Sequence, residues 1–190
     1  MINQKPNIIG VIVSLWIFLI HFNGFAVQET ITTPLITDMK HKYTDTLDYP
    51  ESFAYILFTF SGVLSVLTFI VLRHLNRYIS EFKLVFLSCV MAFIGYMLLI
   101  DYKLRIIEPW RFIIGFGIIS VAFPFGRGVT LSMFSKLIGN HNPGFYMGLI
   151  LAIGAISRII GPFWAVSSLA IEPRVTFGVT AILFVINIIL

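Results

Sequence analysis

Three charged residues stand inside long apolar stretches of this chain. Glu29 is the only acidic residue well within such a stretch, and Arg127 and Arg158 are the cations. A charge at membrane depth faces protein or a water-filled cavity, and it marks an ion pathway, a proton relay or a structural ion pair. The sequence therefore predicts either a solute pathway or helix-locking contacts around these three residues.

Each of the three residues has two readings. Arg158 could attract an anion or pair with a proton-carrying acid, or it could lock two helices together. Arg127 follows Pro124 and could face an anion, or it could extend its guanidinium to the lipid headgroups. Glu29 could carry a coupling proton or pair with one of the two arginines. The sequence allows both readings in each case.

A polar stripe accompanies Glu29 on the first apolar stretch. Its members fall on one face at the helical period: Ser14, His21, Gln28 and Thr32. Such a stripe fits a helix beside a polar cavity, and it also fits hydrogen bonds between helices, which use these residue types. His21 and Gln28 are therefore candidates for an ion pathway or for a helix contact.

No pattern typical of enzymes or cofactors occurs. The sequence has no Gly-rich phosphate loop, no nucleophile elbow and no His/Cys cluster at metal-binding spacing. His41 and Asp45 could share a helix face, which is a weak metal signal. The basic residues are scattered between apolar stretches and form no patch. We expect no enzymatic activity, no cofactor, no metal and no nucleic-acid partner.

The composition is that of a membrane protein. Of 190 residues, 58% are hydrophobic and 12% are charged. A soluble domain is about 45–50% apolar and about 25% charged. The mean hydropathy is +0.94. The single cysteine, Cys89, excludes a disulfide within the chain. The lipid bilayer is therefore the expected environment.

Six apolar segments divide the chain. A helix needs about 20 largely apolar residues to cross the hydrocarbon layer. The expected spans are residues 8–36, 53–72, 84–100, 110–134, 144–170 and 175–190. The last is short for a span. The sequence predicts an all-α polytopic membrane helix bundle, with residues 1–190 forming one transmembrane domain.

Small residues predict close helix packing on the fifth segment. The candidates are Gly144, Gly148, Gly154, Gly161 and Pro162. The first two, with Ala152, fall four residues apart, which is the spacing that lets two backbones approach in lipid. Gly154 and Gly161 flank Arg158 on one face. We expect this helix to pack tightly against a neighbour.

Several stretches resemble a known family. They are Glu29-Thr-Ile-Thr-Thr-Pro34, Met133-Phe-Ser-Lys-Leu-Ile-Gly139, Tyr146-Met-Gly148 and Ser157-Arg-Ile-Ile-Gly-Pro162. With six segments and a short basic loop after the second, nearly the whole chain resembles the C-terminal half of a major facilitator superfamily protein. Within that superfamily, the chain looks like a lysosomal group, the major facilitator superfamily domain-containing protein 8 group, which is linked to ceroid lipofuscinosis.

The resemblance implies helices seven to twelve of a twelve-helix transporter, arranged as two inverted three-helix repeats. It also implies an endolysosomal membrane and the transport of chloride or another small solute. The loop after the second segment departs from the superfamily signature: Leu72, Asn76 and Ile79 stand where Gly, Asp and Gly are usual, and Arg77 is kept. Major facilitator proteins place the substrate site between two halves, and only one half is present here.

Three functions follow from this reading. The first is a major facilitator carrier or channel for an anion or small solute. The second is a proton-coupled transporter of organic solutes, with Glu29 as the coupling acid. The third is a half-length membrane protein that transports nothing and assembles with a partner. The expected partners are a small anion or solute and an N-terminal half or another chain.

Overall fold

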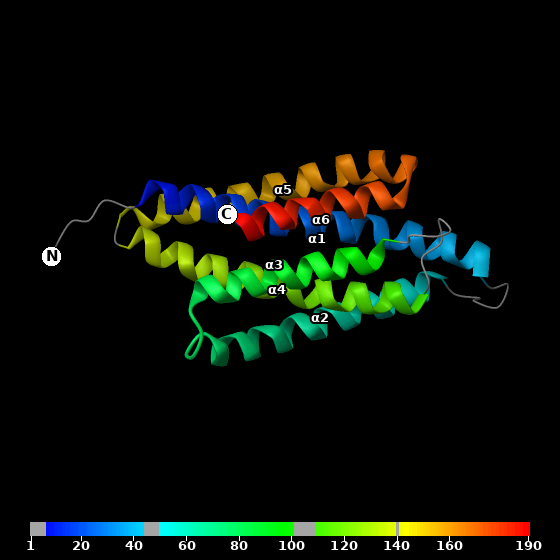
Figure 1. Ribbon diagram of the computed structural model, residues 1–190, viewed down its shortest axis with the longest axis horizontal. Coiled ribbons are helices and arrows are strands. Elements are labelled where there is room, and N and C mark those ends of the chain that lie inside the picture. Colours follow the sequence, from blue (N-terminus) through cyan, green and yellow to red (C-terminus); the bar gives the residue numbers. More distant parts are fainter. Residues whose placement is uncertain (1–6, 44–49, 101–108, 140) are drawn as a thin grey trace.

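The computed structural model describes residues 7–43, 50–100, 109–139 and 141–190, and most residues in these ranges are helical (Figure 1). The helices are α1 (Ile8–Tyr43), α2 (Pro50–Leu75), α3 (Glu81–Leu99), α4 (Pro109–Ile138), α5 (Pro143–Ile171) and α6 (Pro173–Ile189). The prediction of an all-α bundle is confirmed.

The helices begin where proline permits it. Pro50, Pro109, Pro143 and Pro173 are the first residues of α2, α4, α5 and α6. The first N–H groups of a helix have no acceptor within it, so proline loses nothing there, and its fixed φ suits the first turn. Each of these helices therefore starts slightly before the apolar stretch from which it was predicted.

Five of the described helices, α1 to α5, are long and apolar enough to cross a membrane, and α6, with 17 residues, is shorter. Large apolar side chains such as Ile70, Phe163 and Ile182 are exposed on the outside of the bundle. Water solvates such an apolar surface poorly, whereas lipid chains solvate it well. The chain is an integral, multi-pass membrane protein.

The helices pack around a central pair, α1 and α4. α1 and α4 contact each other at the centre; α5 packs on α1 and α2 packs on α4, while α3 packs on α6. Figure 1 shows α5 beside α1 at one edge of the bundle and α2 at the other. α3 also packs closely on α4, and α5 packs on α6, whereas α2 makes no contact with α3 in the described part of the chain. The arrangement as two inverted three-helix repeats stays a prediction from the resemblance.

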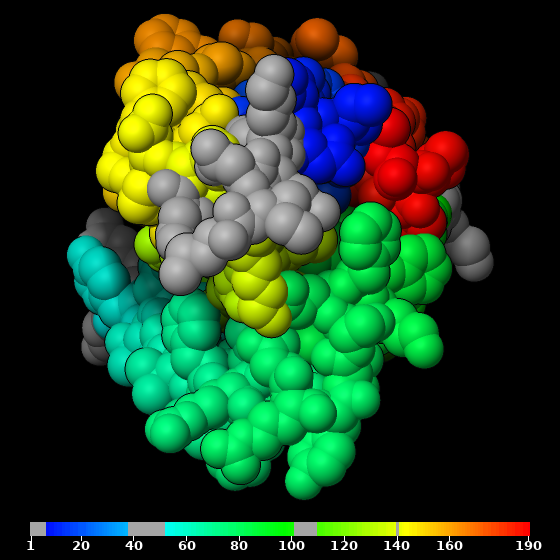
Figure 2. Space-filling view, turned by 90° about the vertical axis from the view of Figure 1, so that its left-hand side faces the viewer, coloured from blue at the N-terminus to red at the C-terminus, as the bar shows by residue number. Residues whose placement is uncertain are grey.

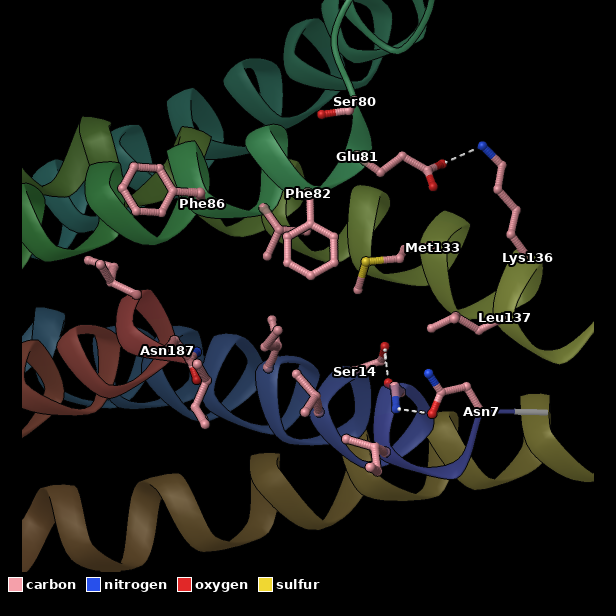
Figure 3. A pocket seen from close by; sticks show the side chains of 17 residues that line it. Asn7, Ser14, Ser80, Glu81, Phe82, Phe86, Met133, Lys136, Leu137 and Asn187 are labelled. Carbon is pink, nitrogen blue, oxygen red and sulfur yellow. Dashed lines mark hydrogen bonds and ion pairs between the residues drawn. The ribbon is translucent and has the colours of Figure 1, made fainter.

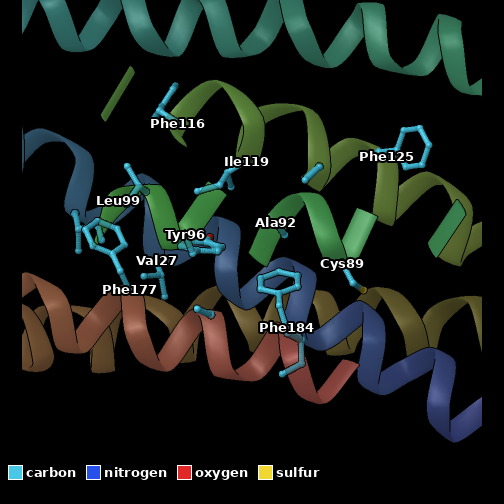
Figure 4. Close-up of a cluster of buried hydrophobic side chains, with 14 of the residues drawn as sticks. Val27, Cys89, Ala92, Tyr96, Leu99, Phe116, Ile119, Phe125, Phe177 and Phe184 are labelled. Atoms are coloured by element: carbon cyan, nitrogen blue, oxygen red, sulfur yellow. The ribbon is translucent and has the colours of Figure 1, made fainter. Parts of the chain in front are cut away.

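The core lies where α1, α3, α4 and α6 meet (Figure 4). Tyr96 of α3 stacks on Phe184 of α6, with ring centroids 5.7 Å apart. α3 and α4 approach closely at a glycine pair: a Cβ added to Gly115 would lie 2.9 Å from the carbonyl oxygen of Gly95. A side chain larger than hydrogen at either glycine would therefore push α3 and α4 apart.

Candidate functional site

Glu29 and Arg158 form an ion pair between α1 and α5. The Nη2 atom of Arg158 lies 3.3 Å from Oε2 of Glu29, and the two side chains are 56% and 39% exposed. The pair therefore lies on an open face of the chain and not in its core. The sequence allowed Glu29 to pair with either arginine, and in the structure it pairs with Arg158.

Glycines on α5 bring the two charges together. A Cβ added to Gly161 would lie 2.9 Å from Cβ of Ala26, and one added to Gly154 would lie 3.0 Å from the ring of Phe18. Both contacts are with α1. Because Arg158 lies between these glycines in the sequence, close backbone approach puts its side chain within reach of Glu29.

A second polar contact fixes the same two helices. The indole Nε1 of Trp164 donates to Oδ1 of Asn23 at 3.1 Å. The Asn23 amide in turn donates to the carbonyl oxygen of Ser157 at 3.4 Å. Asn23 is buried, so these bonds satisfy a polar group that would otherwise be costly. The sequence reading did not single out this pair, because one asparagine and one tryptophan far apart in sequence carry no spacing signal.

Gly144 and Gly148, near the start of α5, face open space in the described chain. A Cβ added to Gly144 or Gly148 would meet nothing within 4 Å. The face of α5 that packs on α1 is instead the one that carries Ile150, Gly154, Ser157, Gly161 and Ala165. Pro162 lies inside the helix beside Gly161 and is half-buried. The close approach within the chain thus falls at Gly154 and Gly161.

Arg127 is exposed on α4 and lies over an aromatic ring of α1. Its guanidinium carbon is 5.1 Å from the ring centroid of Phe22. Rings surround this point: Phe123 stacks on Phe25 at 4.0 Å and meets Phe22 edge-on at 5.2 Å. A cation over a ring face is attracted by the electron density of the ring. Because the ring carries no net charge, the positive charge of the guanidinium is not neutralised.

The two arginines are separated along α1. Arg127 lies at Phe22, and Arg158 lies at Glu29, seven residues farther along. Seven residues are two helical turns and about 10 Å. Residues seven apart also share a face of a helix. The structure thus combines Glu29, Arg127, Arg158 and the rings of Phe22, Phe25 and Phe123 into one feature, which we call the charged face.

His21 and Gln28 do not belong to the charged face. Both are buried. His21 contacts Oγ of Ser88 through Nε2 at 3.1 Å, and the carbonyl oxygen of Ile17 through Nδ1 at 2.9 Å. The Nε2 group of Gln28 donates to the carbonyl oxygen of Phe116 at 3.4 Å. Their stripe on α1 is turned toward α3 and α4, where it makes contacts between helices.

No group of three or more His, Cys, Asp or Glu residues that could hold a metal ion occurs in the described part of the chain. The weak metal pair predicted from His41 and Asp45 lies outside the residues whose side chains are described.

Comparison with known proteins places this geometry in context. No protein family model matches the chain. The chain is similar to "Major facilitator superfamily domain-containing protein 8" of Xenopus laevis, with 24% identity over an alignment 227 residues long. The alignment covers 93% of this chain and 44% of that protein, so the chain spans less than half the length of its relative. The similarity supports a relationship with major facilitator proteins and points to a membrane transporter, not an enzyme.

Proposed function

We propose that this chain is a six-helix unit of a major facilitator-type transport protein, and that a small anion moves along its charged face. One observation carries the proposal. The face holds two guanidinium groups, of Arg127 and Arg158, against the single carboxylate of Glu29. Its net charge is therefore positive, and a positive surface in a low-dielectric environment concentrates anions.

The geometry suggests how an anion would pass. Arg127 is held by an aromatic ring and has no carboxylate beside it among the described residues, so its charge is available to a passing ion. About 10 Å farther along α1, the positive charge of Arg158 is paired with the carboxylate of Glu29. An anion that reaches Arg158 competes with that carboxylate. Binding there is weakened enough for release, as conduction requires.

The proposal includes a second bundle. Major facilitator proteins bind solutes between two six-helix halves, and the aligned relative is more than twice as long as the matched region. The free stripe of Gly144, Gly148 and Ala152 on α5 has the small-residue spacing that accepts a neighbouring helix. We propose that a second half or another chain covers the charged face and completes the pathway.

Chloride is the anion that we propose, and an endolysosomal membrane is the proposed location. Both come from the resemblance to the lysosomal group.

Chloride efflux from proteoliposomes tests the proposal. Arg127→Gln and Arg158→Gln are compared with the unchanged protein and with Arg73→Gln, which removes an exposed charge at the end of α2. Slower efflux in the first two variants alone supports a pathway along the charged face. Equal efflux in all four proteins rules it out. If the chain passes no solute by itself, the third function, assembly with a partner, is favoured.

Glu29 favours a second candidate, a proton-coupled transporter of organic anions. Its carboxylate is 39% exposed and pairs with Arg158. Protonating Glu29 would free Arg158 to bind an anionic solute, so proton and solute would bind together. Uptake that ignores an imposed pH gradient, and that survives Glu29→Gln, excludes this candidate.

A further inference from the structure

The cations of the described bundle differ in what surrounds them. Figure 2 views the end of the bundle where α1 begins and α6 ends, and Figure 3 shows an apolar pocket there that Lys136 helps to line. The Nζ atom of Lys136 lies 2.8 Å from Oε1 of Glu81, so a carboxylate balances its charge. Arg158 is likewise paired with a carboxylate. Arg127 has no carboxylate beside it among the described residues, and it lies over the ring of Phe22.

The walls beside Arg127 are aromatic. Its guanidinium carbon is 5.1 Å from the centroid of the Phe22 ring. Phe123, one turn before Arg127 on α4, stacks on Phe25 of α1 with ring centroids 4.0 Å apart. Phe25 and Phe123 are half-buried, so part of each ring is exposed. A phenyl ring has no N–H or O–H group to donate. An anion held here would therefore exchange part of its hydration shell for the N–H groups of one guanidinium and for ring surface.

This exchange costs least for an anion that holds its water weakly. The free energy needed to remove water from an ion rises as the charge is concentrated in a smaller volume. The guanidinium spreads its own charge over a plane and is weakly hydrated, so it returns less energy to a small anion than a compact ammonium group would. Ion selectivity depends on this balance between lost water and the strength of the groups that replace it. Delocalised charge and apolar walls together favour large monovalent anions.

We propose that Arg127 selects large, weakly hydrated monovalent anions. Thiocyanate and nitrate would then bind to the charged face more tightly than chloride, and chloride would bind more tightly than fluoride. This inference rests on the proposed function, because an anion must reach the charged face to be selected there. It adds the class of anion, and it assigns the selection to Arg127 and to the apolar wall of Phe25 and Phe123.

Competition with radiolabelled chloride tests the order of binding. Chloride uptake into proteoliposomes is measured with increasing external thiocyanate, nitrate or fluoride, and protein-free liposomes give the background. Competition reports binding whether or not the competitor passes, so it serves for a carrier and for a channel. Thiocyanate should halve the uptake at a several-fold lower concentration than fluoride, with nitrate between them.

The outcomes separate this inference from the proposed function. Chloride uptake that Arg127→Gln slows, but that fluoride inhibits as well as thiocyanate does, overturns the selection of weakly hydrated anions and leaves the pathway intact. Uptake no faster than in protein-free liposomes, or uptake that Arg127→Gln does not change, refutes the proposed function. The selection at Arg127 is then refuted with it.

Arg127→Lys locates the selection. It keeps a positive charge but replaces the delocalised group with a compact, strongly hydrated ammonium. Chloride uptake should persist, while the advantage of thiocyanate over fluoride should shrink several-fold. Arg73→Lys makes the same exchange at an exposed position at the end of α2 and should leave the order unchanged. An unchanged order in Arg127→Lys would contradict the assignment to Arg127.

Two variants of Phe123 test the apolar wall. Phe123→Leu keeps the wall apolar, whereas Phe123→Asn adds N–H donors on a side chain of similar shape to leucine. The order should be unchanged in Phe123→Leu. The advantage of thiocyanate should narrow in Phe123→Asn, because the amide can replace water around a small anion. Equal narrowing in both variants would contradict the role of the wall. Thermal unfolding checks each fold, and if Phe123→Asn does not fold, Arg127→Lys decides.

Discussion

The carboxylate of Glu29 and the guanidinium of Arg158 lie 3.3 Å apart across the contact of α1 with α5, and both side chains remain partly exposed. On a face that water reaches, as we propose for this one, an ion pair contributes about 0–1 kcal/mol to stability. Stability therefore gives little reason to keep two charges in the middle of long apolar helices, where charges are expensive. Binding or moving an ion is the reason that we infer.

The first prediction concerns this pair. Arg158→Gln removes the cation and should lower chloride efflux several-fold. Glu29→Gln removes the competing carboxylate and should leave efflux intact or raise it. Efflux is followed from proteoliposomes loaded with chloride. Because the pair is exposed, both variants should unfold within a few degrees of the unchanged protein. Equal losses of efflux in the two variants would mean that the pair acts structurally.

Arg127 gives the second prediction. Arg127→Gln should lower chloride efflux by a similar factor, because it removes the cation that has no carboxylate beside it among the described residues. Arg127→Lys keeps the charge over Phe22 and should retain most of the efflux. If both variants lose efflux equally, a positive charge alone is not sufficient and the guanidinium group is required. If neither changes efflux, Arg127 is outside the pathway.

The third prediction separates two glycines of α5. Gly161→Ala places a methyl group 2.9 Å from Cβ of Ala26 and should destabilise the chain by about 1–3 kcal/mol. Gly148→Ala meets nothing within 4 Å in this chain, so it should be neutral or stabilise the helix by up to about 1 kcal/mol. Thermal unfolding in detergent compares the two. A loss of stability in Gly148→Ala alone would contradict the packing described above.

A fourth prediction concerns the buried histidine. A Cβ added to Gly126 would clash with Nε2 of His21 and would lie 2.8 Å from Oγ of Ser88. Gly126→Ala should therefore displace His21 and lower the stability by about 1–3 kcal/mol. Gly117 is also in α4, but a Cβ there meets nothing within 4 Å, so Gly117→Ala is the matched control. Equal unfolding temperatures of Gly126→Ala and Gly117→Ala would show that His21 can move aside without a loss of stability.

The helices and their mid-membrane charges could be predicted from the sequence, because long apolar segments and isolated ions are local signals. Helix starts could be predicted less well. Pro50 and Pro109 extend α2 and α4 into polar sequence, since proline suits a first turn. α1 likewise continues past Pro34 to Tyr43.

Orientation about the helix axis was the harder part. α5 carries small residues on two faces, and the spacing of Gly144 and Gly148 is as good as that of Gly154 and Gly161. Only tertiary packing decides which pair meets α1. The role of the stripe with His21 and Gln28 could not be decided from the sequence for the same reason. A buried helix contact and a cavity lining use the same polar side chains. The rings beside Arg127 gave no signal because phenylalanine is common in every segment.

Aqueous access to the charged face tests the central claim most directly. In a Cys89→Ser background, which removes a buried thiol, Ala155→Cys probes α5 three residues before Arg158, and Ile182→Cys probes the outside of α6. Both positions are exposed in the chain, so only their surroundings differ. Applied to membranes, a charged thiol reagent should modify Ala155→Cys readily and leave Ile182→Cys unmodified. An Ala155→Cys variant that is as unreactive as Ile182→Cys would show that water does not reach the face, and it would contradict the account.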